Sequence, residues 1–160
     1  MFGFFRNLFK SSDQIVYIRF TRDKISFYYY PSDVRYEDEP LLAIKKKGKK
    51  EIVSAVGKEI YDLKTEDNSV VHTPFKPFLL EPDNFNLAEK VIRYLMKKGA
   101  TFKGSLVSPR VIIHPDKTYV AEGEEQAYKE LALSAGAREA VVYVGDELSV
   151  DELEGVMQNR

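Results

Sequence analysis

The side chains best suited to bind an anion lie close together near the N-terminus, where Arg19, Arg22 and Lys24 occur within one short segment. The segment Tyr17-Ile-Arg-Phe-Thr-Arg-Asp-Lys24 combines a strand pattern with a polar turn. Its cations therefore lie on a strand face and at a turn. Such cations attract phosphate in a suitable cleft, but strand and turn cations are more often only solvated. A ligand role for this cluster stays open.

The sequence gives little support for metal or covalent chemistry. Cysteine is absent, so a thiol nucleophile and a cysteine-ligated zinc site are excluded. His72 and His114 are the only histidines and lack a pattern of nearby ligands, so we interpret both as structural. No Gly-x-Ser-x-Gly element, P-loop or dinucleotide fingerprint occurs. We therefore expect no catalytic residues, no cofactor-binding residues and no metal ligands.

The composition is that of a single globular domain with an uneven charge distribution. The chain has 160 residues, of which 44% are hydrophobic and 31% charged. Residues 1–50 carry eleven Lys and Arg against six Asp and Glu, or +5, whereas residues 116–160 carry four against eleven, or −7. The two faces can simply be solvated differently, or the N-terminal end can meet an anionic partner. We do not expect nucleic acid as a partner, because the net charge is only −1.

Residues 1–12 differ from the rest and predict a short amphipathic segment ahead of a single domain at 13–160. On a helical wheel, Met1, Phe2, Phe5, Leu8 and Phe9 share one face and Arg6 and Lys10 the other. A phenylalanine-rich stripe beside cations is typical of helices that lie in a membrane interface. The alternative is a terminal segment packed on the domain itself. The predicted membrane-binding residues are Phe2, Phe5, Arg6, Leu8, Phe9 and Lys10.

The remaining pattern predicts an α/β fold with a mixed sheet and helices on its faces. Expected strands are 15–20, 25–30, 41–44, 51–56, 111–113 and 139–144, and expected helices are 86–98, 122–135 and 150–157. Asn86 is expected to cap the first helix and Gly99 to end it. The lysine-rich link Lys45-Lys-Lys-Gly-Lys-Lys50 is interpreted as a solvated hairpin tip, with a lipid or partner contact as the alternative.

Several short segments, in order and at compatible spacing, resemble the first domain of MreB, the bacterial actin homologue that determines rod shape. The segments are the phenylalanine-rich start, Glu39-Pro40 before Leu41-Leu-Ala-Ile44, Ala55-Val-Gly-Lys-Glu59, Ser108-Pro-Arg-Val111 and Ser134-Ala-Gly-Ala-Arg-Glu139. The resemblance implies an actin-like fold with a ribonuclease-H-type core, called subdomain IA. It also implies a small inserted subdomain IB at about residues 39–70.

The chain departs from the family in its nucleotide-binding motifs. The first hairpin of actin-like proteins presents a phosphate loop with an aspartate and a glycine, but here Arg19 takes the aspartate position and no glycine is present. The family's second phosphate loop would lie beyond Arg160. The family also keeps a glutamate that positions the attacking water, and Glu124 lies closest to its position, with Glu122 and Glu125 as rivals. On this basis we expect a pseudo-ATPase that is not an enzyme.

The expected function follows from the resemblance. It is a non-catalytic MreB-like interaction module of the cell-shape or envelope-assembly machinery, which docks to another actin-like or envelope-complex protein. The expected place is the cytoplasm, peripheral to the inner membrane, with contact through the N-terminus. The alternative is a residual or split actin-like ATPase subunit that needs a second chain to complete its nucleotide site. The sequence does not identify the partner or the oligomeric state.

Overall fold

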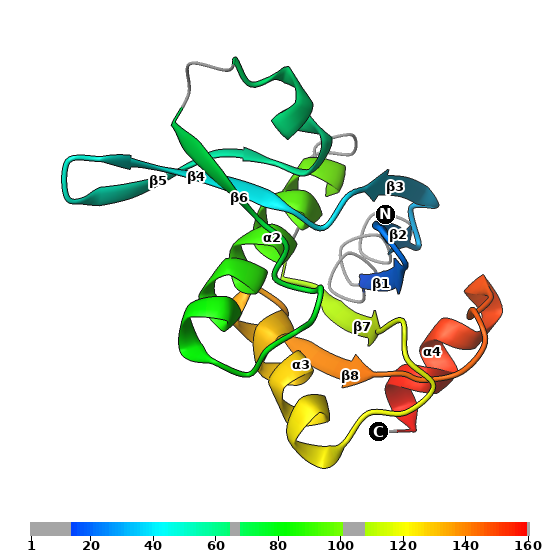
Figure 1. Ribbon diagram of the computed structural model, residues 1–160. Helices are drawn as coiled ribbons and strands as arrows, with labels where there is room; N and C mark the ends of the chain where they lie inside the picture. Colours follow the sequence, from blue (N-terminus) through cyan, green and yellow to red (C-terminus); the bar gives the residue numbers. More distant parts are fainter. Residues whose placement is uncertain (1–13, 65–67, 101–107, 160) are drawn as a thin grey trace.

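A mixed five-stranded sheet forms the centre of the molecule (Figure 1). The computed structural model describes residues 14–64, 68–100 and 108–159. The strand order is β3-β2-β1-β7-β8, with β1 (Ile15–Thr21), β2 (Lys24–Tyr30), β3 (Val34–Asp38), β7 (Arg110–His114) and β8 (Glu139–Val142). β1, β2 and β3 pair antiparallel, and β1, β7 and β8 pair parallel. The carboxyl ends of three neighbouring strands therefore lie at one edge of the sheet.

A second sheet of three strands packs beside the first. Its order is β5-β4-β6, with β4 (Leu42–Lys47), β5 (Lys50–Val56) and β6 (Ser69–His72), and the 3-10 helix η1 (Gly57–Asp62) follows β5. Its apolar residues Leu42, Ile44 and Val56 join the main core. The boundaries of an inserted subdomain at residues 39 and 70 stay a prediction.

Helices cover both faces of the large sheet unequally. α2 (Pro82–Ala100) and α3 (Glu122–Ser134) cover one face, where residues such as Val16, Ile18, Val111 and Ile113 build the larger core. The other face is covered by the 3-10 turn η2 (Val150–Glu152) and the short helix α4 (Leu153–Gln158), which form a smaller core with residues of β1, β2, β7 and β8. The predicted mixed sheet with flanking helices is confirmed.

α2 differs from its prediction at both ends. It begins at Pro82 instead of Asn86, since proline suits the first turn of a helix, where its missing N–H leaves no hydrogen bond unmade. It also runs through Gly99 to Ala100. A Cβ on Gly99 would lie 2.2 Å from Oη of Tyr29, whose hydroxyl donates to the carbonyl of Met96 at 2.6 Å. Gly99 therefore allows close approach of helix and sheet and does not end the helix.

Two strands, β3 and β6, were not predicted. In β3, half-buried Val34 and Tyr36 alternate with exposed Arg35 and Glu37, which is the pattern of an edge strand with one solvated face. β6 is four residues long, and its central pair Val70 and Val71 is exposed. Such a short segment carries too little periodicity to be recognised, and only its pairing with β4 makes it a strand.

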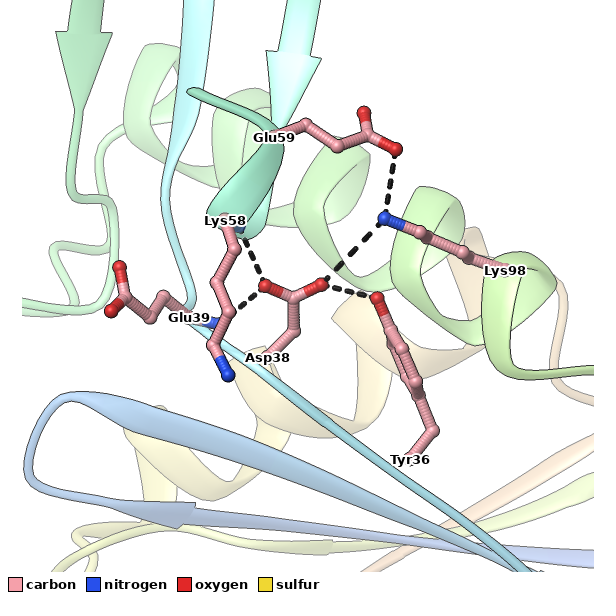
Figure 2. A network of polar contacts seen from close by, with 6 residues as sticks. All are labelled: Tyr36, Asp38, Glu39, Lys58, Glu59 and Lys98. Carbon is pink, nitrogen blue, oxygen red and sulfur yellow. Dashed lines mark hydrogen bonds and ion pairs between the residues drawn. The ribbon is translucent and has the colours of Figure 1, made fainter. Parts of the chain in front are cut away.

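The buried carboxylate of Asp38 joins the two sheets at the end of β3 (Figure 2). Asp38 is 3% exposed, and its Oδ1 accepts the backbone N–H of Glu39 at 2.8 Å and of Lys58 at 2.7 Å. Its Oδ2 accepts the hydroxyl of Tyr36 and lies 4.0 Å from Nζ of Lys98. Burial, and then the hydrogen bond to Asp38, raise the pKa of Tyr36 well above its ordinary value. Strand β3, helix η1 and helix α2 thus meet at one carboxylate.

Gly57 leaves the space that this carboxylate needs. Its φ is +70°, which L side chains rarely adopt, and a Cβ there would lie 2.3 Å from Oδ1 of Asp38. A larger residue would push the first turn of η1 away from Asp38. The carboxylate and the glycine therefore act as a pair.

Replacing Asp38 by alanine is expected to lower the free energy of unfolding by about 3–5 kcal/mol, because two backbone N–H groups and the Tyr36 hydroxyl lose their acceptor. Urea denaturation measures the change, with Asp38→Asn as the milder variant if the first does not fold. Glu37→Ala, on the neighbouring half-exposed side chain, is the control and should change stability by less than about 1 kcal/mol. Equal effects at positions 37 and 38 would contradict the role given to Asp38.

Candidate functional site

The candidate site is a groove where the parallel strands β1, β7 and β8 end. In open α/β sheets, ligands bind outside the carboxyl ends of the strands. This strand-end groove has a volume of about 560 Å³ and is lined by Arg19, Phe20, His114, Pro115, Asp116, Lys117, Thr118, Tyr119 and Gly145. Most of these residues come from the segment that directly follows β7. Asp116, Lys117 and Tyr119 were not singled out as site residues from the sequence. Polar residues directly after a buried strand are the signal that could have identified them.

His114 fixes the floor of the groove through two hydrogen bonds. Its Nε2 lies 2.9 Å from the carbonyl oxygen of Gly145, and its Nδ1 lies 2.6 Å from the hydroxyl of Tyr17. A carbonyl only accepts, so Nε2 carries the proton and Nδ1 accepts the hydroxyl proton of Tyr17. The Tyr17 oxygen in turn accepts the backbone N–H of Leu148 at 3.2 Å. This chain of bonds connects β7, β1 and the loop before η2.

The environment keeps His114 neutral. Burial lowers the pKa of its imidazole, and the nearby Arg19 guanidinium lowers it further, against the opposing effect of the Gly145 carbonyl. A second proton on the imidazole would also turn Nδ1 from an acceptor into a donor and break its bond with the Tyr17 hydroxyl. The interpretation of His114 as a structural histidine stays consistent with this geometry.

The three cations whose ligand role was left open by the sequence do not converge on one point. Arg19 pairs with Glu147 at 3.4 Å on the face covered by η2, and Lys24 pairs with Glu37 at 3.3 Å across the β2–β3 pair. The side chain of Arg22 is exposed at the turn, and its backbone N–H donates to Oδ2 of Asp116 at 2.9 Å. A carboxylate of the chain thus occupies the turn amide that would otherwise face a ligand. An incoming anion would have to displace Asp116.

Of the three rival glutamates, Glu124 lies nearest the groove. Its carboxylate pairs with Lys117, which lines the groove, whereas Glu125 pairs with Lys129 on the same helix at 3.4 Å. Glu122 is exposed at the first position of α3. Of these three glutamates, Glu124 is therefore the one that contacts a residue of the groove lining.

The other predicted site residues receive no structural description. Phe2, Phe5, Arg6, Leu8, Phe9 and Lys10 lie outside the described residues. Among the described residues, no three His, Asp or Glu side chains gather as metal ligands would. Within the same residues, no helix is long and apolar enough to span a membrane.

We expect the free energy of unfolding to fall as the pH is lowered from about 7 toward 5. Because the folded pKa of His114 lies below its ordinary value of about 6.5, the unfolded chain takes up this proton first. The stability is fully present above pH 6.5 and is lost as the pH falls toward the folded pKa. Denaturation at several pH values should show a shallower loss for His114→Gln than for the unaltered protein. Identical slopes would assign the pH dependence to other groups.

Comparison with known proteins identifies the family. The family model described as MreB/Mbl protein matches residues 24–155. No curated protein sequence matches the chain. Among solved structures, MreB5 of Spiroplasma citri bound to ADP has a TM-score of 0.62 at 20% identity and covers 84% of this chain and 39% of its own. A non-polymerising MamK mutant bound to AMPPNP has a TM-score of 0.63 at 9% identity, with 82% and 40% covered.

A further match, the MamK double helical filament, has a TM-score of 0.59 at 8% identity and covers 83% of this chain and 41% of its own. The chain thus spans about two fifths of the length of these structures. The likeness confirms the predicted actin-like fold.

The prediction that the chain is not an enzyme is contradicted. It rested on the missing glycine of the first hairpin, on Arg19 at the aspartate position, and on a second phosphate loop expected beyond Arg160. MreB5 has been solved with bound ADP and with bound AMPPNP, so the chain is similar to a protein that binds adenine nucleotides. A degenerate hairpin motif was not sufficient ground for excluding that activity. Because the family model matches most of its length, the chain belongs to the MreB/Mbl protein family.

Proposed function

We propose that this chain is an actin-fold docking module of the cell-shape or envelope-assembly machinery, placed at the cytoplasmic face of the inner membrane. It binds another actin-like protein through the strand-end groove, and that protein adds a second wall to the groove. The observation that carries the proposal is an exposed aromatic side chain, Tyr119, at the rim of a groove whose charged groups already have partners.

The polar groups of the groove have little unused binding capacity. Arg19, Lys117 and Asp116 are each engaged within the chain, with Glu147, Glu124 and the Arg22 amide respectively. Charged groups that are paired in this way contribute more to the orientation of a docked protein than to its affinity. Binding energy must therefore come from apolar and aromatic surface beside them.

Tyr119 supplies such surface. It is 76% exposed, and tyrosine is among the residues that most often dominate the binding energy of protein interfaces. It lies in the segment between β7 and α3, beside Lys117 and Thr118. A partner that covers Tyr119 would also close the groove from outside.

The solved relatives support the proposal that this docking takes place in an assembly that also binds nucleotide. MamK forms a double helical filament, and both MreB5 and MamK have been solved with nucleotides. By the family resemblance, phosphate groups would lie at the β1–β2 hairpin, whose residues Arg19 and Phe20 line the same groove. A docked partner would exclude water from that region, and Glu124 would then face the enclosed space.

Tyr119→Ala is expected to weaken binding of the actin-like partner by about thirtyfold, or about 2 kcal/mol, as for a central aromatic contact. Cross-linking and mass spectrometry in native lysate identify the partner, and calorimetry with the purified pair measures the affinity. ATP turnover by the mixture serves as a second readout of a closed groove. Tyr94→Ala, on an exposed tyrosine of α2, is the matched control and should leave binding unchanged. Equal losses for both variants would argue against docking at the groove.

The membrane part of the proposal is tested through residues 1–10. The full chain is expected to float with anionic liposomes and a chain that begins at Ser12 to float much less, because each buried Phe or Leu contributes up to about 1.5–3 kcal/mol before the cost of ordering is subtracted. Phe5→Ser with Phe9→Ser tests the apolar stripe without shortening the chain. Flotation that is the same for all three proteins would remove the N-terminal contact from the proposal.

A further inference from the structure

The link between β4 and β5 carries the densest positive charge of the sequence. This basic hairpin, residues 45–50, contains five lysines around Gly48, and the nearest acidic residue along the chain is Glu51. The two strands extend away from the rest of the molecule, so that the tip stands apart from both cores (Figure 1). A Cβ on Gly48 would have no neighbour within 4 Å. Residues 46–50 at the tip are exposed to solvent.

Four of the five lysines at the tip have no acidic partner in the described parts of the chain. Lys46, Lys47, Lys49 and Lys50 are exposed, and within the described ranges no ion pair joins any of them to an acidic residue. By contrast, the two cations that line the strand-end groove, Arg19 and Lys117, each have a carboxylate beside them. Over residues 45–51 the charge is +5 from lysine and −1 from Glu51, or +4.

Apolar side chains accompany the lysines on one face of the small sheet. Cross-strand partners share a face, and Lys45 pairs with Ile52 while Lys47 pairs with Lys50. Val71 of β6 lies on the same face, opposite Ala43. Ile52 is 36% exposed and Val71 51% exposed. A surface that combines lysines with exposed aliphatic side chains suits the headgroup region of a bilayer, where lysine stems cover apolar contacts and their ammonium groups reach phosphate.

A second copy of the chain fits this surface less well. The acidic residues around η2 and α4 lie far from the basic hairpin (Figure 1). Several of their carboxylates are engaged already: Glu147 with Arg19, Glu154 with Arg110 and Glu152 with Ser149. The acidic end would remain on the side away from an anionic surface that the hairpin contacts, so its repulsion is smallest in that orientation.

A folded protein partner also fits less well. The centres of protein interfaces are depleted in lysine and enriched in tyrosine, tryptophan and arginine, none of which occurs between residues 45 and 52. Clusters of four to eight lysines or arginines are typical of contacts with anionic lipids. From the exposed lysines, the shared apolar face and the distant acidic end, we propose that the basic hairpin binds the phosphate headgroups of an anionic phospholipid bilayer.

This contact would be a second attachment of the chain to the membrane. It rests on the membrane location given under the proposed function. It is independent of residues 1–10, because it uses β4, β5 and β6. The two attachments differ in character. The N-terminal one depends on apolar burial, whereas the hairpin contact depends on anionic lipid and weakens as salt is added.

The test compares two pairs of lysine substitutions in the full chain. Sedimentation with vesicles of phosphatidylcholine and phosphatidylglycerol measures partitioning, and vesicles of phosphatidylcholine alone give the neutral reference. Lys47→Gln with Lys49→Gln should weaken partitioning by about 25-fold, at about fivefold for each lysine. Lys64→Gln with Lys97→Gln, two exposed lysines elsewhere, makes the same change in net charge and should alter partitioning by less than about twofold.

Three outcomes would overturn the hairpin contact: equal losses for both pairs, unchanged partitioning of Lys47→Gln with Lys49→Gln, and binding that is as strong on phosphatidylcholine alone. Sedimentation of the pure protein provides a further check. A dimer at low salt that Lys47→Gln with Lys49→Gln abolishes would assign the surface to a second copy and reject the lipid. Loss of flotation on removal of residues 1–11 concerns the N-terminal contact alone, so the failure of either attachment can be told from the failure of the other.

Discussion

The position of the small sheet on the large one depends on the buried carboxylate of Asp38. It receives N–H groups from Glu39 and Lys58 and a hydroxyl from Tyr36, so the end of β3 and the start of η1 cannot separate without leaving a charge in the core. Lys98 of α2 lies within 4.0 Å and adds a third element. A buried carboxylate without partners strongly destabilises the fold. The end of β3 and the start of η1 can therefore separate only by local unfolding, and not by a gradual shift of one sheet on the other. The basic hairpin on β4 and β5 is thus held by a rigid base.

A second polar chain has the same effect at the strand-end groove. The imidazole of His114 lies between the Tyr17 hydroxyl and the Gly145 carbonyl, and Tyr17 receives the amide of Leu148. The loop before η2 is therefore fixed to β1 and β7 by side chains, not by sheet pairing. These hydrogen bonds couple the groove to the loop, so a partner that displaces one of them would also displace the other.

The fold was largely predictable because its elements carry strong periodicity, but the site was not. The β1–β2 hairpin and the strands β7 and β8 follow from runs of β-branched residues between turns. The bond from the Arg22 amide to Asp116 spans most of the chain and has no local sequence signal. Gly99 was taken for a helix end because local rules do not include the approach of Tyr29. Activity was misjudged for a related reason, since missing nucleotide-binding motifs were weighed more heavily than the family as a whole.

The strand-end groove and the basic hairpin differ in whether their charged side chains are paired within the chain, and this difference suits them to different proposed roles. At the strand-end groove, cations and carboxylates neutralise one another, so a ligand there must offer shape and apolar contact or displace an existing pair. At the basic hairpin, the charge remains available and acts over about a Debye length, roughly 10 Å at moderate salt. A long-range, weakly specific attraction is suited to finding a surface, and a short-range, charge-matched groove is suited to selecting a partner on it. Under the two proposals, membrane encounter would precede docking, because the hairpin would orient the molecule before the groove met its partner.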